Sequence, residues 1–210
     1  MNEKGIFISV MGTMGSGKTT AAKLLAQKLT YTLMTEHYEE NNFLPRFYDD
    51  MKRWAFHSQT FFLLEKVRQL EQIPELLLTN SIIQDTPIIQ DVYSYAQAQY
   101  KLNNMDHEEW KLYRKTYESL NGHLRQPDFI VYLDASVDTI MERIANRGRE
   151  YEQSIPRSYI ELLDKLNAEW LETTTIPVVK INTNSRNFVH KELDQEFFTI
   201  SVRHAIAQYR

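Results

Sequence analysis

The chain has 210 residues, of which 42% are hydrophobic and 25% charged, values that fit one globular domain with a sizeable core. No stretch approaches the roughly 20 uninterrupted apolar residues of a membrane helix, and a net charge of -4 argues against a nucleic-acid polymer as partner. Because the chain lacks cysteine and its first residues do not form a signal peptide pattern, we expect no disulfides and a cytoplasmic location.

Short apolar runs alternate with longer helical patterns along the chain. The runs predict strands at 5–11 (GIFISVM), 31–35, 87–91 (PIIQD), 128–133 and 176–181. Helices are expected over about 18–29, 44–70, 105–121, 137–146, 156–171 and 187–208. This alternation is typical of a parallel sheet with helices on both faces, so we expect one α/β domain over 1–210 with a five-stranded parallel sheet.

A glycine-rich segment follows the first predicted strand and opens the first predicted helix. It reads GTMGSGKT and matches the G-x-x-x-x-G-K-[ST] pattern of phosphate-binding loops. Its backbone N–H groups can converge on phosphate oxygens, Lys18 can reach the terminal phosphates, and Thr19 can ligate Mg²⁺. The bland alternative is a glycine-rich turn. We expect ATP to bind through Gly12, Gly15, Ser16, Gly17, Lys18, Thr19 and Thr20.

Asp91 ends the predicted PIIQD strand. A side chain at that point lies at the carboxyl edge of a parallel sheet, where ligands of open α/β folds bind. We therefore expect Asp91 to be a catalytic acid that holds Mg²⁺ or its waters. The alternative is a helix N-cap or a surface acid.

Three arginines cluster in MERIANRGRE. The spacing of four between Arg143 and Arg147 places both on one helix face, and Gly148 lets the chain turn before Arg149. Such a group can close over a triphosphate and neutralise charge on the transferring phosphoryl group. A solvated basic end of a helix is the alternative.

The helix predicted from residue 44 carries Tyr48, Ala55, Gln59, Phe62 and Lys66 on one stripe. An ordinary core stripe would not include an amide and an ammonium group, so this face can line a cleft that holds a base. Periodicity alone leaves a core stripe equally open.

Glu36 directly follows the second predicted strand, and Glu39 and Glu40 come later in the same loop. A carboxylate at that sheet edge can take a proton from a substrate hydroxyl. A loop acid that caps the following helix is equally compatible with the spacing.

Together, the segments GTMGSGKT, FYDDMKRWAFHSQTFFL, PDFIVYLDAS and RIANRGREYE resemble the deoxynucleoside kinase family, especially its bacterial deoxyadenosine and deoxyguanosine kinases. The resemblance spans about residues 6–172. It implies a P-loop kinase fold and transfer of the ATP γ-phosphate to the 5′-hydroxyl of a deoxynucleoside, in nucleotide salvage. It further implies Mg²⁺ and a homodimer, or a heterodimer with a related subunit.

The resemblance also implies roles for individual residues. It puts the catalytic glutamate on Glu36, with Glu39 as second choice. Tyr48 and Glu152 then hold the sugar 3′-hydroxyl, and Trp54 and Gln59 belong to the base site. The three arginines become part of a lid over about 143–155.

The chain departs from the family pattern at three places. Asp91 is followed by Val92 and Tyr93 where many members have arginine and serine, Lys66 stands where arginine is usual, and Gln97 where many have a base-reading aspartate. Lysine lacks the planar paired donors of arginine, so base recognition should be altered; we favour a purine.

Two other functions stay open at this stage. A nucleoside monophosphate kinase has a similar phosphate loop and lid, but the acidic segment EHYEENN favours an uncharged acceptor. A weakly active regulatory subunit is suggested by Val92 in place of arginine. A P-loop switch protein is disfavoured because the sequence has no guanine-reading N-K-x-D segment.

Overall fold

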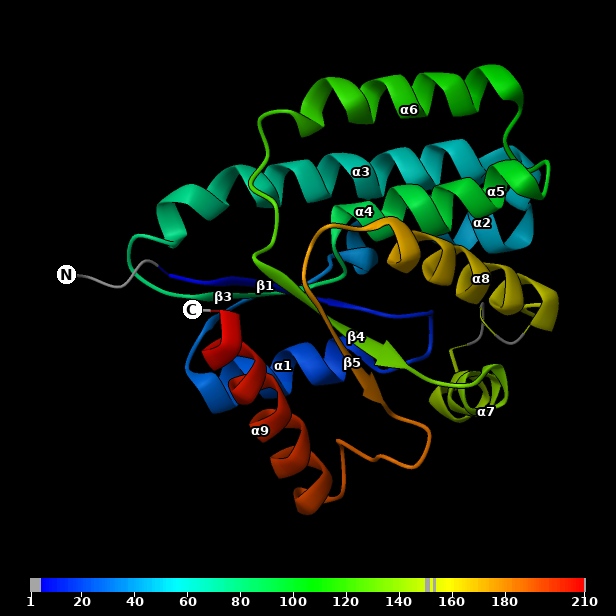
Figure 1. Cartoon of the computed structure of the whole chain (residues 1–210). Helices are drawn as coiled ribbons and strands as arrows, with labels where there is room; N and C mark the ends of the chain where they lie inside the picture. Colours follow the sequence, from blue (N-terminus) through cyan, green and yellow to red (C-terminus); the bar gives the residue numbers. More distant parts are fainter. Residues whose placement is uncertain (1–4, 150–151, 153, 210) are drawn as a thin grey trace.

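The computed structural model describes residues 5–149, 152 and 154–209. Its centre is a five-stranded sheet in the order β2-β3-β1-β4-β5, in which every neighbouring pair is parallel (Figure 1). The strands are β1 (Phe7–Met11), β2 (Thr32–Met34), β3 (Ile82–Asp85), β4 (Phe129–Asp134) and β5 (Val178–Asn182). The prediction of a five-stranded parallel sheet in an α/β fold is confirmed.

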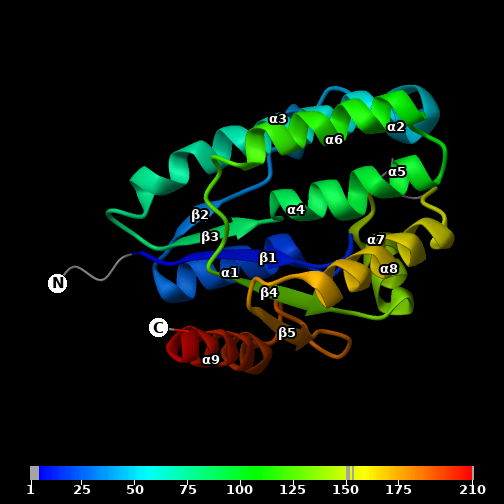
Figure 2. The same cartoon turned by 45° about the horizontal axis from the view of Figure 1, so that its top comes forward.

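Helices cover both faces of the sheet (Figure 2). On one face lie α1 (Lys18–Leu29) and α9 (Glu192–Tyr209); on the other lie α3 (Met51–Leu76), α6 (His107–Asn121) and α8 (Arg157–Thr173). Successive residues of a strand point to opposite faces, so β1 sends Phe7 and Met11 into one apolar core and Ile8 and Val10 into the other. Burial on both faces explains why the strands read as continuous apolar runs.

The third strand lies at a different position from the one predicted from the sequence. The letters IIQD occur twice, at 82–85 and 88–91, and the first copy is β3. The second copy forms α4 (Ile88–Gln90) and the start of η2 (Asp91–Ala96), a π-helical segment that continues into α5 (Gln97–Lys101). Thr86 has a φ of 60° and turns the chain out of the strand, and Pro87 then occupies the N-cap of α4. The predicted strand over 87–91 is therefore wrong.

The helix predicted over 44–70 is two helices. A short α2 (Leu44–Asp49) ends at Asp50, whose carboxylate accepts a hydrogen bond from the Arg53 backbone N–H at 3.0 Å and caps α3. The second helix runs beyond the predicted end to Leu76, with Pro74 in its last turn.

The helices predicted over 105–121, 137–146 and 156–171 agree with α6, α7 (Val137–Arg147) and α8, whereas the helix predicted from residue 187 begins at Glu192 as α9. Among the described residues, no helix combines the length and the apolar character needed to cross a membrane.

Candidate functional site

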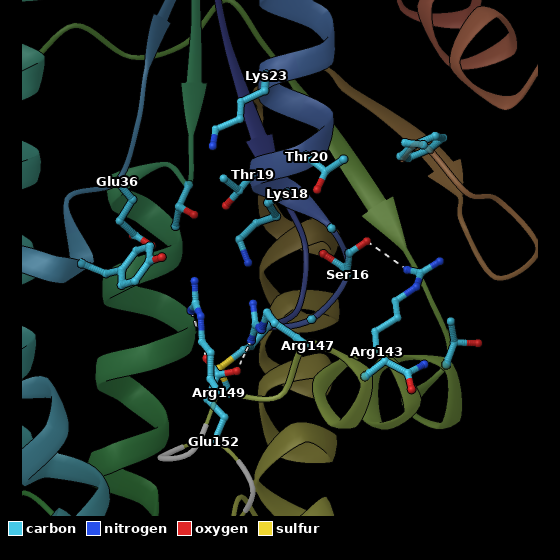
Figure 3. A pocket seen from close by; sticks show the side chains of 18 of the residues that line it. Ser16, Lys18, Thr19, Thr20, Lys23, Glu36, Arg143, Arg147, Arg149 and Glu152 are labelled. Carbon is cyan, nitrogen blue, oxygen red and sulfur yellow. Dashed lines mark hydrogen bonds and ion pairs between the residues drawn. The ribbon is translucent and has the colours of Figure 1, made fainter. Parts of the chain in front are cut away.

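A cavity of about 1050 Å³ opens at the carboxyl edge of the sheet (Figure 3). Its walls come from the loop after β1, the loop after β2, the helices α3 and η2, the end of α7, and the loop after β5. Parallel strands end at the same edge, so residues distant in sequence meet there. The cavity contains most of the residues singled out from the sequence: Gly15, Ser16, Gly17, Lys18, Thr19, Thr20, Glu36, Tyr48, Gln59, Asp91, Arg143, Arg147, Arg149 and Glu152.

The segment 12–17 forms a tight loop between β1 and α1, as its pattern predicts. A Cβ on Gly12 would lie 2.6 Å from the Ser16 Oγ and 2.7 Å from the Leu133 carbonyl oxygen, so only glycine fits. Gly17 caps α1 with a φ of 100°, a conformation that side chains disfavour. The unpaired N–H groups of the first helical turn therefore face the cavity at the positive end of α1, where phosphate is favoured.

Lys18 is held near this loop. Its Nζ donates to the Gly12 carbonyl oxygen at 2.9 Å and to the Tyr95 hydroxyl at 3.2 Å. Burial lowers its pKa, although the nearby carboxylates of Asp85 and Glu36 oppose that effect. A phosphate chain would supply the negative charge that favours the ammonium form.

Asp85, which the sequence reading passed over, is the acid at the end of β3. Its Oδ2 accepts a 2.6 Å hydrogen bond from the Thr19 hydroxyl, so the two groups that suit Mg²⁺ lie together. The strand-end argument made for Asp91 therefore applies to Asp85, because Asp91 lies one helical turn further on, in η2. Asp85 is followed by Thr86 and Pro87, so the arginine that the resemblance led us to expect after the strand-end acid is replaced here too.

Glu36 directly follows β2 and Thr35, as expected, and reaches into the cavity (Figure 3). Its Oε1 lies 3.8 Å from the Lys66 Nζ; the Lys66 side chain is 2% exposed and that of Glu36 25%. Burial raises the pKa of Glu36, and Lys66 opposes the rise. A carboxylate with a raised pKa is a better proton acceptor than one in water.

Two buried polar side chains, Gln59 and Asp91, belong to residues that line the cavity. The Asp91 Oδ2 and the Gln59 Oε1 are among the buried atoms of the described residues that have no hydrogen-bond partner. Burial raises the pKa of Asp91 to about 8, with Glu36 adding to the rise and Lys66 opposing it. Buried polar atoms usually have partners, so this pair is suited to binding a polar ligand.

The end of α7 brings the arginines to the cavity. Arg147 and Arg149 both form ion pairs with Glu152, whose side chain is 3% exposed; the Arg149 contact is 3.1 Å. Arg149 also stacks on the Tyr38 ring at 4.2 Å. In Figure 3 both guanidinium groups point between Lys18 and Glu36. Residues 150, 151 and 153 of the expected lid lie outside the described residues.

Arg143 points away from its two neighbours (Figure 3). Its guanidinium donates to the Ser16 carbonyl oxygen at 3.0 Å and to the Thr183 hydroxyl at 3.2 Å. It thus ties the phosphate loop to the loop after β5. Burial lowers its pKa. The three arginines are close in sequence, but their guanidinium groups lie in two separate places.

Three predicted substrate residues are not among the described residues that line the cavity: Trp54, Lys66 and Gln97. Trp54 stacks on Phe43 at 5.8 Å. Lys66 is buried outside the cavity lining, where its Nζ donates to the Asp85 carbonyl oxygen at 3.1 Å and pairs with Glu36. Gln97 lines a second, smaller cavity between α5, α6 and α8, so the structure does not bring it to the base site.

Sequence reasoning missed two parts of the lining. One is Tyr95, whose hydroxyl contacts Lys18 and which would have been found had residues 91–101 been read as helix. The other is the loop of residues 184–190, which has no motif and is brought to the cavity by β5 and the Arg143 contacts.

Comparison with known proteins gives a consistent result. A family profile described as deoxynucleoside kinase matches residues 8–207. The chain is 32% identical over 205 residues to a deoxyguanosine kinase of Bacillus subtilis strain 168, covering 95% of this chain and 97% of that protein. It is 31% identical over 192 residues to a deoxyadenosine/deoxycytidine kinase of the same strain, covering 90% and 88%.

Solved structures of deoxyadenosine kinases are also similar to this chain. The deoxyadenosine kinase of M. mycoides with bound dATP matches with a TM-score of 0.81 and 27% identity, covering 96% of this chain and all of that one. The same enzyme with dCMP and a flexible dCDP bound gives a TM-score of 0.82.

Proposed function

Because this chain belongs to the deoxynucleoside kinase family, we propose that it transfers the γ-phosphoryl group of ATP to the 5′-hydroxyl of a purine deoxynucleoside. It is a phosphotransferase with a P-loop kinase fold. The named relatives act on deoxyguanosine, deoxyadenosine or deoxycytidine, and the purine kinases among them support a purine acceptor here.

One observation carries the proposal. A single cavity has a phosphate-binding loop with Lys18 on one side and a partly buried carboxylate, Glu36, on another, with Arg147 and Arg149 directed between them (Figure 3). A triphosphate on the loop and a hydroxyl near Glu36 would meet in the space that the arginines face. Positioning and charge neutralisation are the main requirements of phosphoryl transfer.

The roles follow from these places. Glu36 accepts the proton of the 5′-hydroxyl as its oxygen bonds to the γ-phosphorus, while the bond from that phosphorus to the bridging oxygen of ADP breaks. Lys18, Arg147 and Arg149 neutralise the charge on the phosphoryl oxygens during transfer. Tyr48 and Glu152 hold the sugar.

The residues also fit Mg²⁺. The Thr19 hydroxyl and the Asp85 carboxylate are hard oxygen donors 2.6 Å apart beside the phosphate loop. Among the described residues no group of three or more His, Cys, Asp or Glu is placed to hold a metal ion, so phosphate oxygens would complete the coordination. When bound, the ion supplies charge stabilisation to the phosphates.

The base fits beside Gln59 and Asp91. Both residues line the cavity, from α3 and η2, and their side-chain amide and carboxyl groups can hydrogen-bond to the edge of a base. We therefore assign Asp91 to the base in place of the metal, and exclude Gln97, which lies at the other cavity.

The acceptor end of the cavity favours a nucleoside over a nucleoside monophosphate. Glu36 and Glu39 both line it, and their carboxylates would oppose a phosphate on the acceptor. No second function is favoured by a particular feature of the site.

We also infer that the protein acts as a dimer in the cytoplasm. Leu64 of α3 and Leu112 of α6 are 48% and 55% exposed on neighbouring helices, which suits a helical interface. Light scattering should give the mass of two chains for the wild type and of one chain for Leu64→Glu. A wild-type monomer would refute the dimer.

The acceptor assay tests the function directly. The purified chain is incubated with ATP, Mg²⁺ and each of the four deoxynucleosides, and then with dAMP and dGMP. The proposal expects the highest kcat/KM with deoxyguanosine or deoxyadenosine and no turnover of the monophosphates. Preference for a pyrimidine would remove the purine assignment, and preference for a monophosphate would remove the acceptor class.

A further inference from the structure

Gln90 binds both backbone polar groups of Gly12, the first glycine of the phosphate loop. Its Nε2 donates to the Gly12 carbonyl oxygen at 2.6 Å, and its Oε1 accepts from the Gly12 N–H at 3.4 Å. The Gln90 side chain is fully buried at the end of α4. None of the roles assigned above uses this residue.

The sheet explains why Gly12 needs such a partner. The Val10 carbonyl oxygen accepts a hydrogen bond of 3.1 Å from the Thr86 N–H, so Val10 presents its backbone groups to β3. Backbone groups alternate along a strand, which makes Gly12 the next residue to face that side. However, β3 ends at Asp85, and the side-chain amide of Gln90 takes the place of a further strand residue.

The same carbonyl also holds Lys18. The Lys18 Nζ lies 2.9 Å from the Gly12 carbonyl oxygen, which therefore accepts from both side chains through its two lone pairs. Because a phosphate chain would compete with this oxygen for the Lys18 ammonium, we expect Lys18 to turn from the carbonyl to the phosphates when nucleotide binds. With Gln90 present, the carbonyl keeps one donor after the lysine has moved; without it, a buried acceptor would be left without a partner.

We propose that Gln90 is a positioning residue for nucleotide binding, which keeps the Gly12 carbonyl hydrogen-bonded so that Lys18 is free to turn to the phosphates. This inference rests on the proposed binding of ATP at the phosphate loop. It adds a residue that touches neither substrate and acts through Gly12 and Lys18.

The test measures ADP affinity, with Mg²⁺, by titration calorimetry. Gln90→Leu should weaken ADP binding about tenfold, the order expected when a buried acceptor loses its partner. In a Lys18→Met background, the same substitution should change the affinity by less than about twofold, because no lysine then has to leave the carbonyl. Full additivity of the two substitutions would overturn the proposal.

A second variant gives a pH signature. In Gln90→Glu, the protonated acid can donate its O–H to the Gly12 carbonyl and accept from the N–H, whereas the ionised form cannot donate. Its ADP affinity relative to the wild type should therefore rise as the pH falls. A ratio that does not change with pH would count against the proposal, and this variant serves if Gln90→Leu does not fold.

Gln99→Leu is the matched control. Gln99 is also a fully buried glutamine of the 88–101 segment; it donates to the Tyr159 hydroxyl at 2.9 Å and accepts from Asn104 at 2.8 Å. Its loss should leave ADP affinity unchanged even if the melting temperature falls. An equal loss in both variants would overturn the role of Gln90, whereas a wild type that binds no ADP would overturn the nucleotide site as well.

Discussion

Replacing Glu36 by glutamine should slow phosphoryl transfer strongly with little effect on acceptor binding. Glutamine keeps the size of the side chain and an oxygen that can accept from Lys66, which lies 3.8 Å away, but it cannot take up a proton at the 5′-hydroxyl. Loss of a general base typically lowers the rate by about 10²- to 10⁴-fold. We therefore expect kcat to fall by that order while the KM for the deoxynucleoside changes little.

The pH dependence of kcat tests whether Glu36 is the catalytic base. Burial raises the pKa of Glu36, so the wild-type rate should fall on the acidic side as this carboxylate becomes protonated. Glu36→Gln should lose that limb when ADP release is followed between pH 5.5 and 9. Glu39→Gln is the control, because Glu39 is exposed in the same loop and lines the same cavity. A larger fall in kcat for Glu39→Gln, or an acidic limb that persists in Glu36→Gln, would refute the assignment.

Four further substitutions test neighbouring parts of the site. Lys66→Met removes the cation that lowers the pKa of Glu36, so the acidic limb of the kcat profile should move to higher pH. If the limb does not move, Lys66 does not control the ionisation of Glu36. Arg147→Ala should lower kcat by about 10²-fold or more, because the charge that develops in the transition state is then not neutralised. Arg143→Ala should mainly raise the KM for ATP, because the Arg143 contacts hold the phosphate loop. The reverse pattern would contradict the separate roles of the two arginines. Asp91 has a pKa raised to about 8, so unfolding releases its proton and the wild type loses stability between the ordinary aspartate pKa and about pH 8. The gain in melting temperature from Asp91→Asn should therefore grow from pH 5 to pH 8 and then level off; an equal gain at every pH would contradict the raised pKa.

The phosphate loop and four of the five strands could be predicted because local chemistry determines them. Only glycine fits at Gly12, and the pattern around it occurs between a strand and a helix. Glu36 could be placed because it follows β2 so closely that few paths are open to it. Both predictions depend on a short stretch of chain.

The third strand could not be located in the same way, since the same four letters form a strand at 82–85 and a helical segment at 88–91. Which copy joins the sheet depends on pairing with β1 and β2, which are distant in sequence. Because the strand was predicted over 87–91, the metal-binding role was assigned to Asp91, and Asp85 was not recognised as a candidate. The position of the Arg143 guanidinium, away from Arg147 and Arg149, likewise depends on a hydrogen bond to Thr183, forty residues away.

The position of the transferred phosphate tests the central claim most directly. The product formed from ATP and deoxyguanosine can be examined by ³¹P NMR with proton coupling. If the cavity directs the 5′-hydroxyl to Glu36, the new phosphorus signal should couple to the two 5′ protons of the sugar. Coupling to the single 3′ proton, or release of inorganic phosphate without a nucleotide product, would contradict the account.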